Sequence, residues 1–185
     1  MREDFKVTVY DTIEDGHPIQ KVAFEHAEVL SGSFRDFVGT VNAKGTLIRS
    51  FCVSIPNDQV QYLKDNDIPV SDWAPKEDPE AVPIYLVKIK INFSYYKAPV
   101  ITTREGDDGE AVLCREEAIH LLQRTIFTDC NFTARITHGV YLNKPYTNLY
   151  LDRAAFTKMK NEPNPIEKEM FGGFSVGFEE EVPFN

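Results

Sequence analysis

Lysines and tyrosines gather near the middle of the chain. Lys88 and Lys90 alternate with apolar residues, and Tyr95, Tyr96 and Lys97 follow within a few positions. Single-stranded nucleic acid needs this combination, because its phosphates require positive charge and its unstacked bases require an aromatic surface. Two adjacent tyrosines at the end of a strand cannot both face a core, so at least one ring is expected to be exposed.

The segment that must position these residues runs from Ile84 to Phe93 and has an unbroken period of two. One side carries Tyr85, Val87, Ile89, Ile91 and Phe93, and the other carries Leu86, Lys88, Lys90 and Asn92. This alternation predicts a strand of an antiparallel sheet with one buried and one solvated face. The alternative interpretation is that the two lysines do no more than solvate that outer face.

Composition is that of an ordinary globular protein of one domain. The 185 residues are 42% hydrophobic and 26% charged, and the many phenylalanines and tyrosines favour β structure. No apolar run is long enough to cross a membrane, and the Met-Arg-Glu-Asp start lacks the apolar core of a signal peptide, so we expect a cytosolic protein. The wide spacing of Cys52, Cys114 and Cys130 predicts reduced, buried thiols rather than disulfides or a zinc site.

Net charge is −9, which taken alone argues against a nucleic-acid partner. The acidic residues are concentrated at the two ends, however. Residues 1–30 carry three basic and seven acidic side chains, and residues 161–185 carry one basic and six acidic side chains. Residues 31–160 hold sixteen of each sign, so a basic face there is compatible with the total.

The remaining patterns predict a small β-barrel. Predicted strands cover residues 5–10, 20–30, 34–41, 46–55, 84–93, 99–103, 132–141 and 147–151. Gly45 supplies the left-handed position of a short hairpin loop, and Trp73 lies in a proline-rich loop over residues 67–83. A short helix is predicted over 59–66 and a longer one over 113–127, with Ala118, Leu121, Leu122 and Ile126 as its apolar stripe. The last two strands form a hairpin across residues 143–145, and the set favours a closed or nearly closed barrel.

Motifs of enzymatic chemistry are absent from the sequence. It has no glycine-rich phosphate loop, no Gly-x-Ser-x-Gly elbow and no His-Glu-x-x-His pair. Asp107 and Asp108 give weak support to a metal-dependent nuclease, but flanking glycines are more typical of an exposed turn. We therefore expect neither catalysis nor a bound metal.

The C-terminal segment combines acidic residues with an apolar tip. Glu179, Glu180 and Glu181 precede Val182, Pro183 and Phe184 after a glycine-rich stretch. Such a segment cannot fold alone, but it can dock with Phe184 in a hydrophobic pocket and its glutamates on basic residues. The alternative is an acidic tail that only maintains solubility.

Two parts of the chain resemble a known family. The first lies between Gly39 and Leu151 and includes Gly45, Arg49, Phe51, Trp73, the run Tyr85-Leu-Val-Lys-Ile-Lys-Ile91 and Pro99-Val-Ile101. It is similar to the OB-fold single-stranded-DNA-binding proteins of tailed bacteriophages. The C-terminal segment resembles the acidic Pro-Phe tips of bacterial and phage single-stranded-DNA-binding proteins, although Asn185 follows Phe184 here.

The resemblance implies a mainly β fold: a five-stranded Greek-key OB barrel with extra strands, two short helices and a flexible acidic tail. The barrel domain would cover residues 1–170 and the tail residues 171–185. The resemblance also implies that the protein coats single-stranded DNA without strong sequence specificity during phage replication or recombination. It would act in the cytoplasm of the infected bacterium, with no membrane and no cofactor, and it allows a homodimer. The tail would recruit replication or recombination proteins.

Candidate contacts with single-stranded DNA combine the central lysines and tyrosines with other cations and aromatics. They are Arg35, Lys44, Arg49, Trp73, Lys88, Lys90, Tyr95, Tyr96, Lys97, Arg135, Tyr141 and Lys144. Arg35, Lys44, Arg135 and Lys144 are included on charge alone. Each also has a structural alternative: Trp73 and Tyr141 as core or lid aromatics, and Arg49 paired with an acid at the barrel mouth. The competing function is a non-enzymatic structural or interaction protein of the phage particle.

Overall fold

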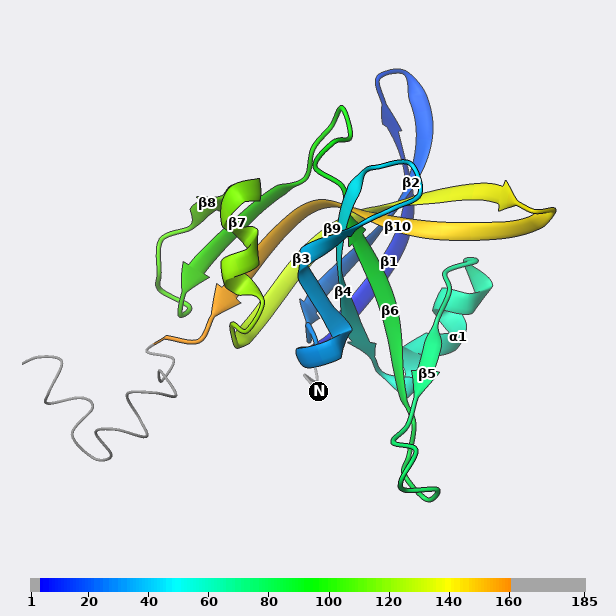
Figure 1. Cartoon of the computed structure of the whole chain (residues 1–185), viewed down its shortest axis with the longest axis horizontal. Helices are drawn as coiled ribbons and strands as arrows, with labels where there is room; N and C mark the ends of the chain where they lie inside the picture. The colour runs from blue at the N-terminus through cyan, green and yellow to red at the C-terminus, as the bar shows by residue number, and fades with distance from the viewer. Residues whose placement is uncertain (1–3, 161–185) are drawn as a thin grey trace, which may run out of the picture.

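The computed structural model describes residues 4–160, and the chain is mainly β (Figure 1). Its strands are β1 (Lys6–Glu14), β2 (His17–Ala27), β3 (Arg35–Val41), β4 (Leu47–Ile55), β5 (Ser71–Trp73), β6 (Ile84–Ile91), β7 (Val100–Glu105), β8 (Val112–Cys114), β9 (Phe127–Tyr141) and β10 (Lys144–Lys158). The helices are α1 (Asn57–Asp65) and two 3₁₀ helices, η1 (Gly32–Phe34) and η2 (Glu116–Leu122). Among the described residues, no helix has the length and apolar character to span a membrane.

Five strands form a partly open Greek-key barrel. β2 pairs with β9, β9 with β10, β10 with β6, and β6 with β4. The β6–β10 pairing is parallel and the others are antiparallel. Just after β2, the first barrel strand, Val29 forms an isolated bridge with Val53 of β4. The Leu30 amide also donates a 2.9 Å hydrogen bond to the Cys52 carbonyl of β4. The order β2, β4, β6, β10, β9 is that of an OB-fold, a partly open barrel, as predicted.

The other strands extend this barrel at its edges. β1 forms a hairpin with β2, β3 a hairpin with β4, and β5 pairs with β6. β7 runs parallel to β10 and carries β8 on its other side. The β9–β10 hairpin projects well beyond the barrel in Figure 1. Gly45 has φ +79° in the β3–β4 turn, the left-handed conformation that the sequence predicted.

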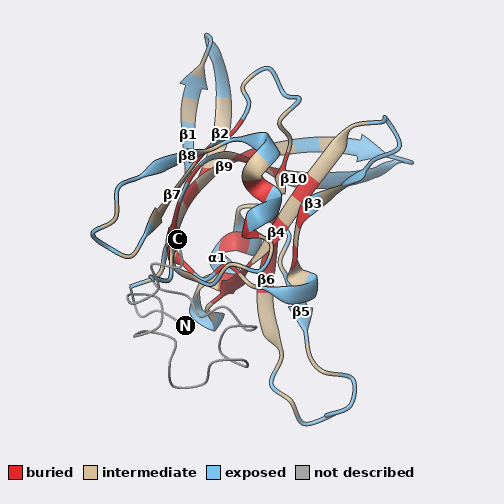
Figure 2. Ribbon diagram, turned by 60° about the vertical axis from the view of Figure 1, so that its left-hand side comes forward, coloured by how far each residue is buried: buried red, intermediate tan, exposed pale blue. Residues whose placement is uncertain are grey.

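Alternate residues of the barrel strands fill one aromatic core. In Figure 2 the buried residues are concentrated in the strands around the centre of the barrel. Phe51 is fully buried, and its ring contacts Phe37, Phe132 and Phe156 edge to face, with centroids 5.3–6.0 Å apart. On β6, Val87, Ile89 and Ile91 are buried while Lys88 is exposed, so the predicted alternation is confirmed for these positions. Leu86 on the predicted solvated face is also buried, and the sheet is mixed rather than antiparallel because β6 pairs in parallel with β10.

The predicted helix over residues 113–127 is wrong. The segment holds β8, then η2, and then the first residue of β9. Ile119 and Leu122 are buried, whereas Leu121 and Ile126 are exposed. A 3₁₀ helix has three residues per turn, so positions three apart face inward, and an α-helical stripe does not describe them. Pairing of Phe127 with Lys158 then extends β9 in place of helix.

Several smaller predictions also need correction. Trp73 lies in β5 and not in a loop. The last hairpin is longer than predicted, and its turn is formed by Leu142 and Asn143, both with positive φ, so that Lys144 belongs to β10. All three cysteines are free, but only Cys130 is fully buried. The predicted domain boundary after residue 170 and the acidic tail lie outside the described residues.

Replacing Phe51 by Ala should lower the free energy of unfolding by about 3–5 kcal/mol, because the ring fills the centre of the barrel and its removal leaves a cavity. Val38→Ala is the control, since Val38 is 63% exposed. Urea titrations of both variants measure the effect. A Phe51→Ala protein as stable as the Val38→Ala protein would contradict this account of the core.

Candidate nucleic-acid interface

The outer face of β4 and β6 carries the two predicted lysines. Lys90 lies opposite Ser50 and Lys88 lies opposite Cys52 in the antiparallel register. Within the described residues, no carboxylate forms an ion pair with either lysine. Burial, and then the neighbouring charge of Lys88, lower the pKa of Lys90. These two side chains therefore make a positive surface whose charge has no partner among the residues described.

Tyrosines continue this surface onto β10. Lys90 lies beside Tyr150 in the parallel pairing of β6 and β10, and Tyr150 lies opposite Arg135 on β9. Tyr146 lies four residues before Tyr150 on β10, so the two side chains point to the same side of the strand. Tyr146 is 45% exposed, and its ring lies over Gly139. The outer face thus places Lys90 of β6 beside an aromatic ring of β10.

The loop after β6 holds Tyr95, Tyr96 and Lys97 over β9. The Tyr95 and Tyr96 rings are 4.7 Å apart between centroids and tilted by 57°, and both are exposed. The Arg135 guanidinium lies 5.3 Å from the Tyr95 centroid, and the Lys97 ammonium lies 5.7 Å from that of Tyr96. The prediction that at least one of the adjacent tyrosines is exposed is confirmed, and cations fix the positions of both rings.

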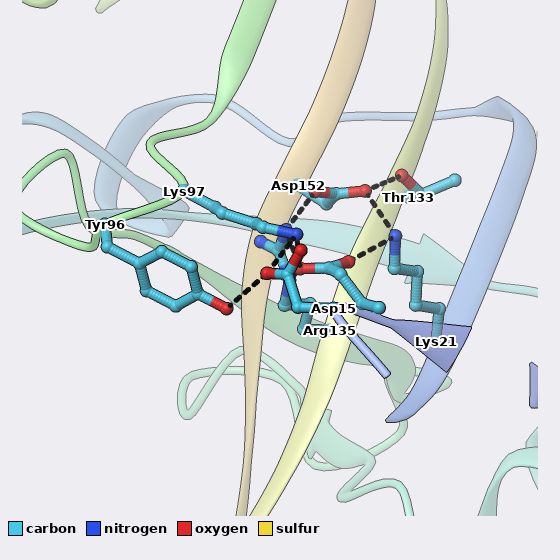
Figure 3. A network of polar contacts seen from close by, with 8 residues as sticks. Asp15, Lys21, Tyr96, Lys97, Thr133, Arg135 and Asp152 are labelled. Carbon is cyan, nitrogen blue, oxygen red and sulfur yellow. Dashed lines mark hydrogen bonds and ion pairs between the residues drawn. The ribbon is translucent and has the colours of Figure 1, made fainter. Parts of the chain in front are cut away.

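A network of ion pairs anchors this loop to the β1–β2 hairpin (Figure 3). Lys97 contacts Glu14 at 3.1 Å and Asp15 at 2.9 Å. Arg135 contacts Glu14 at 2.9 Å and Asp152 at 2.8 Å, and Lys21 contacts the same two carboxylates at 3.2 and 3.0 Å. The Tyr96 hydroxyl donates to Asp15 at 3.3 Å. Three cations balance three carboxylates, so the cluster is neutral as a whole.

Glu14 is the centre of the network. Burial alone would raise the pKa of its carboxyl, but hydrogen bonds from Lys97, Arg135 and Lys21 outweigh burial and lower the pKa from 4.5 to about 2. The same contacts act on the cations: burial opposes charge on Lys21, yet Asp152 and Glu14 raise the pKa of its ammonium group. The network is therefore held together by charge at neutral pH.

A cavity of about 240 Å³ opens between the loop and the outer face of β9 and β10. Its wall consists of Asn92, Tyr95, Lys97, Arg135, Thr137, Tyr150 and Leu151. Tyr150 is half-buried there, and burial, followed by the nearby Tyr146, raises the pKa of its hydroxyl. The cavity adjoins the lysine face because Tyr150 is the cross-strand neighbour of Lys90.

Two of the predicted arginines lie inside the molecule. Arg35 is buried and donates to the carbonyls of Leu30, Leu122 and Thr125 at 2.7–3.0 Å, so it holds η2 and the following turn against β3. Arg49 is buried on the inner face of β4, where it donates to the Phe37 carbonyl at 3.1 Å and pairs with Glu116 at 3.4 Å. The second arrangement matches the alternative of an acid partner. We leave both residues out of the proposed interface.

The remaining predicted residues lie at the margins. Lys44 is exposed in the β3–β4 turn. Tyr141 and Lys144 are paired and exposed at the end of the β9–β10 hairpin, on the same side of the strands as Tyr146 and Tyr150. Trp73 is 47% exposed on β5 and packs edge-on against Phe34 at 5.3 Å, away from the row of Lys90 and Tyr150.

Sequence reasoning missed Tyr146 and Tyr150, together with Asn92 and Thr137 in the cavity wall. A signal for the tyrosines was present, because Lys144, Tyr146, Asn148 and Tyr150 recur with a period of two. Asp107 and Asp108 lie in the turn after β7, where the Asp107 carbonyl accepts from Arg104 at 2.9 Å. Within residues 4–160, no group of three or more His, Cys, Asp or Glu side chains gathers as a metal site would.

Glu14 should make stability depend on acid pH. Because its pKa falls from 4.5 to about 2 on folding, its contribution is present above pH 4.5 and is lost as the pH falls toward 2. Glu14→Gln should lower the free energy of unfolding at pH 7 by on the order of 2 kcal/mol, with the difference from wild type shrinking below about pH 4.5. Urea titrations across this range measure it, with the exposed Glu77→Gln as control. A difference that stays constant with pH would contradict the assigned role of Glu14.

Comparison with known proteins gives structural likeness only. No family model and no curated protein matches the chain. A C-terminally truncated single-stranded DNA-binding protein from bacteriophage Enc34 is 12% identical, with 85% of this chain and 98% of that chain covered and a TM-score of 0.47. The Enc34 protein in complex with single-stranded DNA is 11% identical, with coverage of 88% and 99% and a TM-score of 0.47. Gp2.5, a single-stranded DNA-binding protein encoded by bacteriophage T7, is 10% identical over 97% of both chains with a TM-score of 0.37. At these values the function must be argued from the site itself.

Proposed function

We propose that this chain binds single-stranded DNA along the outer face of β4 and β6, continuing over β10 to the Tyr95–Lys97 loop. The observation that supports this most directly is the juxtaposition of Lys90 with Tyr150, with Lys88 on the same face of β6. Within the described residues neither lysine forms an ion pair, and the tyrosine lies beside Lys90 on the next strand. The phosphates of a single strand would pair with the two lysines, and its bases would stack on the tyrosine ring.

The position of the surface on the barrel also favours this proposal. β4 and β6 are the second and third strands of the OB barrel, and this fold binds oligonucleotides on the face of those strands and with the loops beside it. The connection between the first and second barrel strands, β2 and β4, includes β3 and the turn that contains Lys44. The turn between the fourth and fifth barrel strands, β9 and β10, leads to Lys144. Both lysines could therefore extend the path of the backbone.

The cations with and without a carboxylate partner among the described residues have different roles in this proposal. Lys88 and Lys90 contact phosphates, because no carboxylate among the described residues already satisfies them. Lys97 and Arg135 are held by Glu14, Asp15 and Asp152, so their main role is to position the Tyr95 and Tyr96 rings. A phosphate that paired with either one would have to compete with the carboxylates already in place.

We further propose that the protein is not an enzyme but coats single strands during phage DNA replication or recombination in the bacterial cytoplasm. The absence of catalytic motifs and the lack of base-reading chemistry on the lysine face support a sequence-tolerant coating role. The acidic tip Glu179–Phe184 would recruit replication or recombination proteins, with Phe184 as its apolar anchor.

Binding should be strong for single strands and sensitive to salt. If four phosphates are neutralised, affinity for an oligothymidylate should fall about fifty-fold between about 50 and 200 mM salt. The double variant Lys88→Ala/Lys90→Ala should bind more weakly and lose roughly 0.7 of the salt slope per lysine. Fluorescence anisotropy measures both quantities, with a duplex and an RNA strand of equal length as competitors.

The matched control replaces two exposed lysines elsewhere, Lys6 at the start of β1 and Lys76 between β5 and β6. Its affinity and slope should stay near wild type. Salt-independent binding, or equal losses in the two double variants, would contradict the lysine face. A protein that binds neither DNA nor RNA would instead favour the structural or interaction role.

The acidic tail should compete with DNA for the lysine face. A tethered segment acts at high effective concentration, so deleting residues 177–185 should tighten DNA binding several-fold at low salt, with the gain shrinking as salt rises. Phe184→Ala keeps the charge, so it should leave DNA affinity unchanged while weakening capture of a replication partner. Unchanged affinity in the deletion variant at low salt would exclude the competition. Partner capture that survives Phe184→Ala would leave the tail as a solubility element.

A further inference from the structure

The cavity beneath the Tyr95 loop adjoins the lysine face at Tyr150 but has its own chemistry. It lies against β9 and β10, with Tyr95 above and Tyr150 and Thr137 in its wall. Its volume of about 240 Å³ is below the roughly 300–1,000 Å³ of pockets that hold drug-sized ligands. A ligand that fits must therefore be small, and the two rings favour one that is flat.

The polar groups of the cavity wall are mainly hydrogen-bond donors. Arg135 directs Nε and Nη2 toward Glu14, and Nη2 toward Asp152, whereas no described residue accepts a hydrogen bond from its Nη1. The Asn92 side-chain oxygen accepts from the Ser94 amide at 2.9 Å, which leaves its NH₂ group to donate. Donors of this kind match a heterocycle with a carbonyl oxygen on its edge.

Ion pairs and a cation–π contact hold the walls of the cavity in place. Arg135 lies under Tyr95 at 5.3 Å, and its side chain is only 9% exposed because Glu14 and Asp152 hold it from two sides. Lys97, two residues after Tyr95, is paired with both Glu14 and Asp15. A pocket whose rings are fixed in advance loses less conformational freedom on binding, which increases affinity.

We propose that this cavity binds one nucleobase of the bound strand, a base with a carbonyl edge such as thymine. The inference rests on the proposed function, because it is the phosphates on Lys88 and Lys90 that bring the strand to Tyr150. The captured base leaves its stack and enters beside Tyr95, while its neighbours stay on the open face. The cavity therefore binds a base, whereas the lysine face binds the phosphate backbone.

The test uses the full chain and two strands of equal length, an oligothymidylate and an abasic strand with the same phosphates. Thr137→Phe puts a ring into the cavity, and it should weaken oligothymidylate binding roughly 5- to 150-fold, the value of one stacked base. Its affinity for the abasic strand should stay within about twofold of wild type. Thr8→Phe, which adds the same ring on β1, is the control and should change neither affinity.

Tyr95→Ala provides a second variant in an exposed loop, in case Thr137→Phe does not fold. It should show the same selective loss, and Tyr95→Phe should restore most of the affinity because the ring remains. Equal losses on both strands, or no loss on either, would overturn the base site while leaving the proposed function intact. A wild-type protein that binds neither strand would overturn the proposed function, and the base site with it.

Discussion

The proposed interface depends on the register in which β6 pairs with its two neighbours. Side chains alternate across the barrel wall, so the pairing of Lys90 with Ser50 on β4 and with Tyr150 on β10 places Ile89 and Ile91 inside. A slip by one residue would expose those isoleucines and bury the lysines, at a cost of several kcal/mol for each unpaired charge. The aromatic core that stabilises the barrel is therefore also what keeps the positive charges on the outer face.

A protein with a net charge of −9 must keep its carboxylates away from a surface that attracts phosphates. Near the cavity, the carboxylates are instead neutralised by ion pairs with lysine and arginine side chains. Glu14, Asp15 and Asp152 are balanced by three cations, so the repulsion that these acids would exert on a phosphate is largely cancelled. Residues 161–185 carry six acidic side chains and one basic side chain, so more than half of the net negative charge lies outside the described residues. Charge distribution, and not the total, decides whether DNA can approach.

Local patterns in the sequence predicted the parts of the fold that depend on neighbouring residues. The alternation of β6 and the turn at Gly45 are of this kind. The predictions that were wrong concern residues whose structure depends on partners far away in the sequence. Arg35 looked like a free cation, but its guanidinium reaches carbonyls almost ninety positions away. Residues 113–127 had the apolar spacing of an α-helix. In the structure they form a 3₁₀ helix and the start of β9, whose first residue pairs with β10.

The site was predictable only in part for the same reason. The sequence contained Lys90 and Tyr150 as separate signals, but only the parallel pairing of β6 with β10 makes them neighbours. That pairing crosses sixty positions of chain, and no periodicity within one strand reports it. Likewise, Arg135 was chosen for its charge, while its neighbours show that it supports Tyr95.

A surface that binds a single strand must meet two requirements, and different residues meet them here because Lys97 and Arg135 are paired with carboxylates. A lysine that contacts a phosphate should be free to move with the backbone, so that successive nucleotides of any sequence can be accommodated. An aromatic ring that receives a base should be fixed, because ordering it on binding would cost affinity. Lys88 and Lys90, on a strand and without an acidic partner among the described residues, suit the first requirement. Tyr95, held between Arg135 and a loop anchored through Lys97, suits the second. Exchanging the roles would leave the phosphate contacts rigid and the rings mobile, and both changes would weaken binding to a flexible strand.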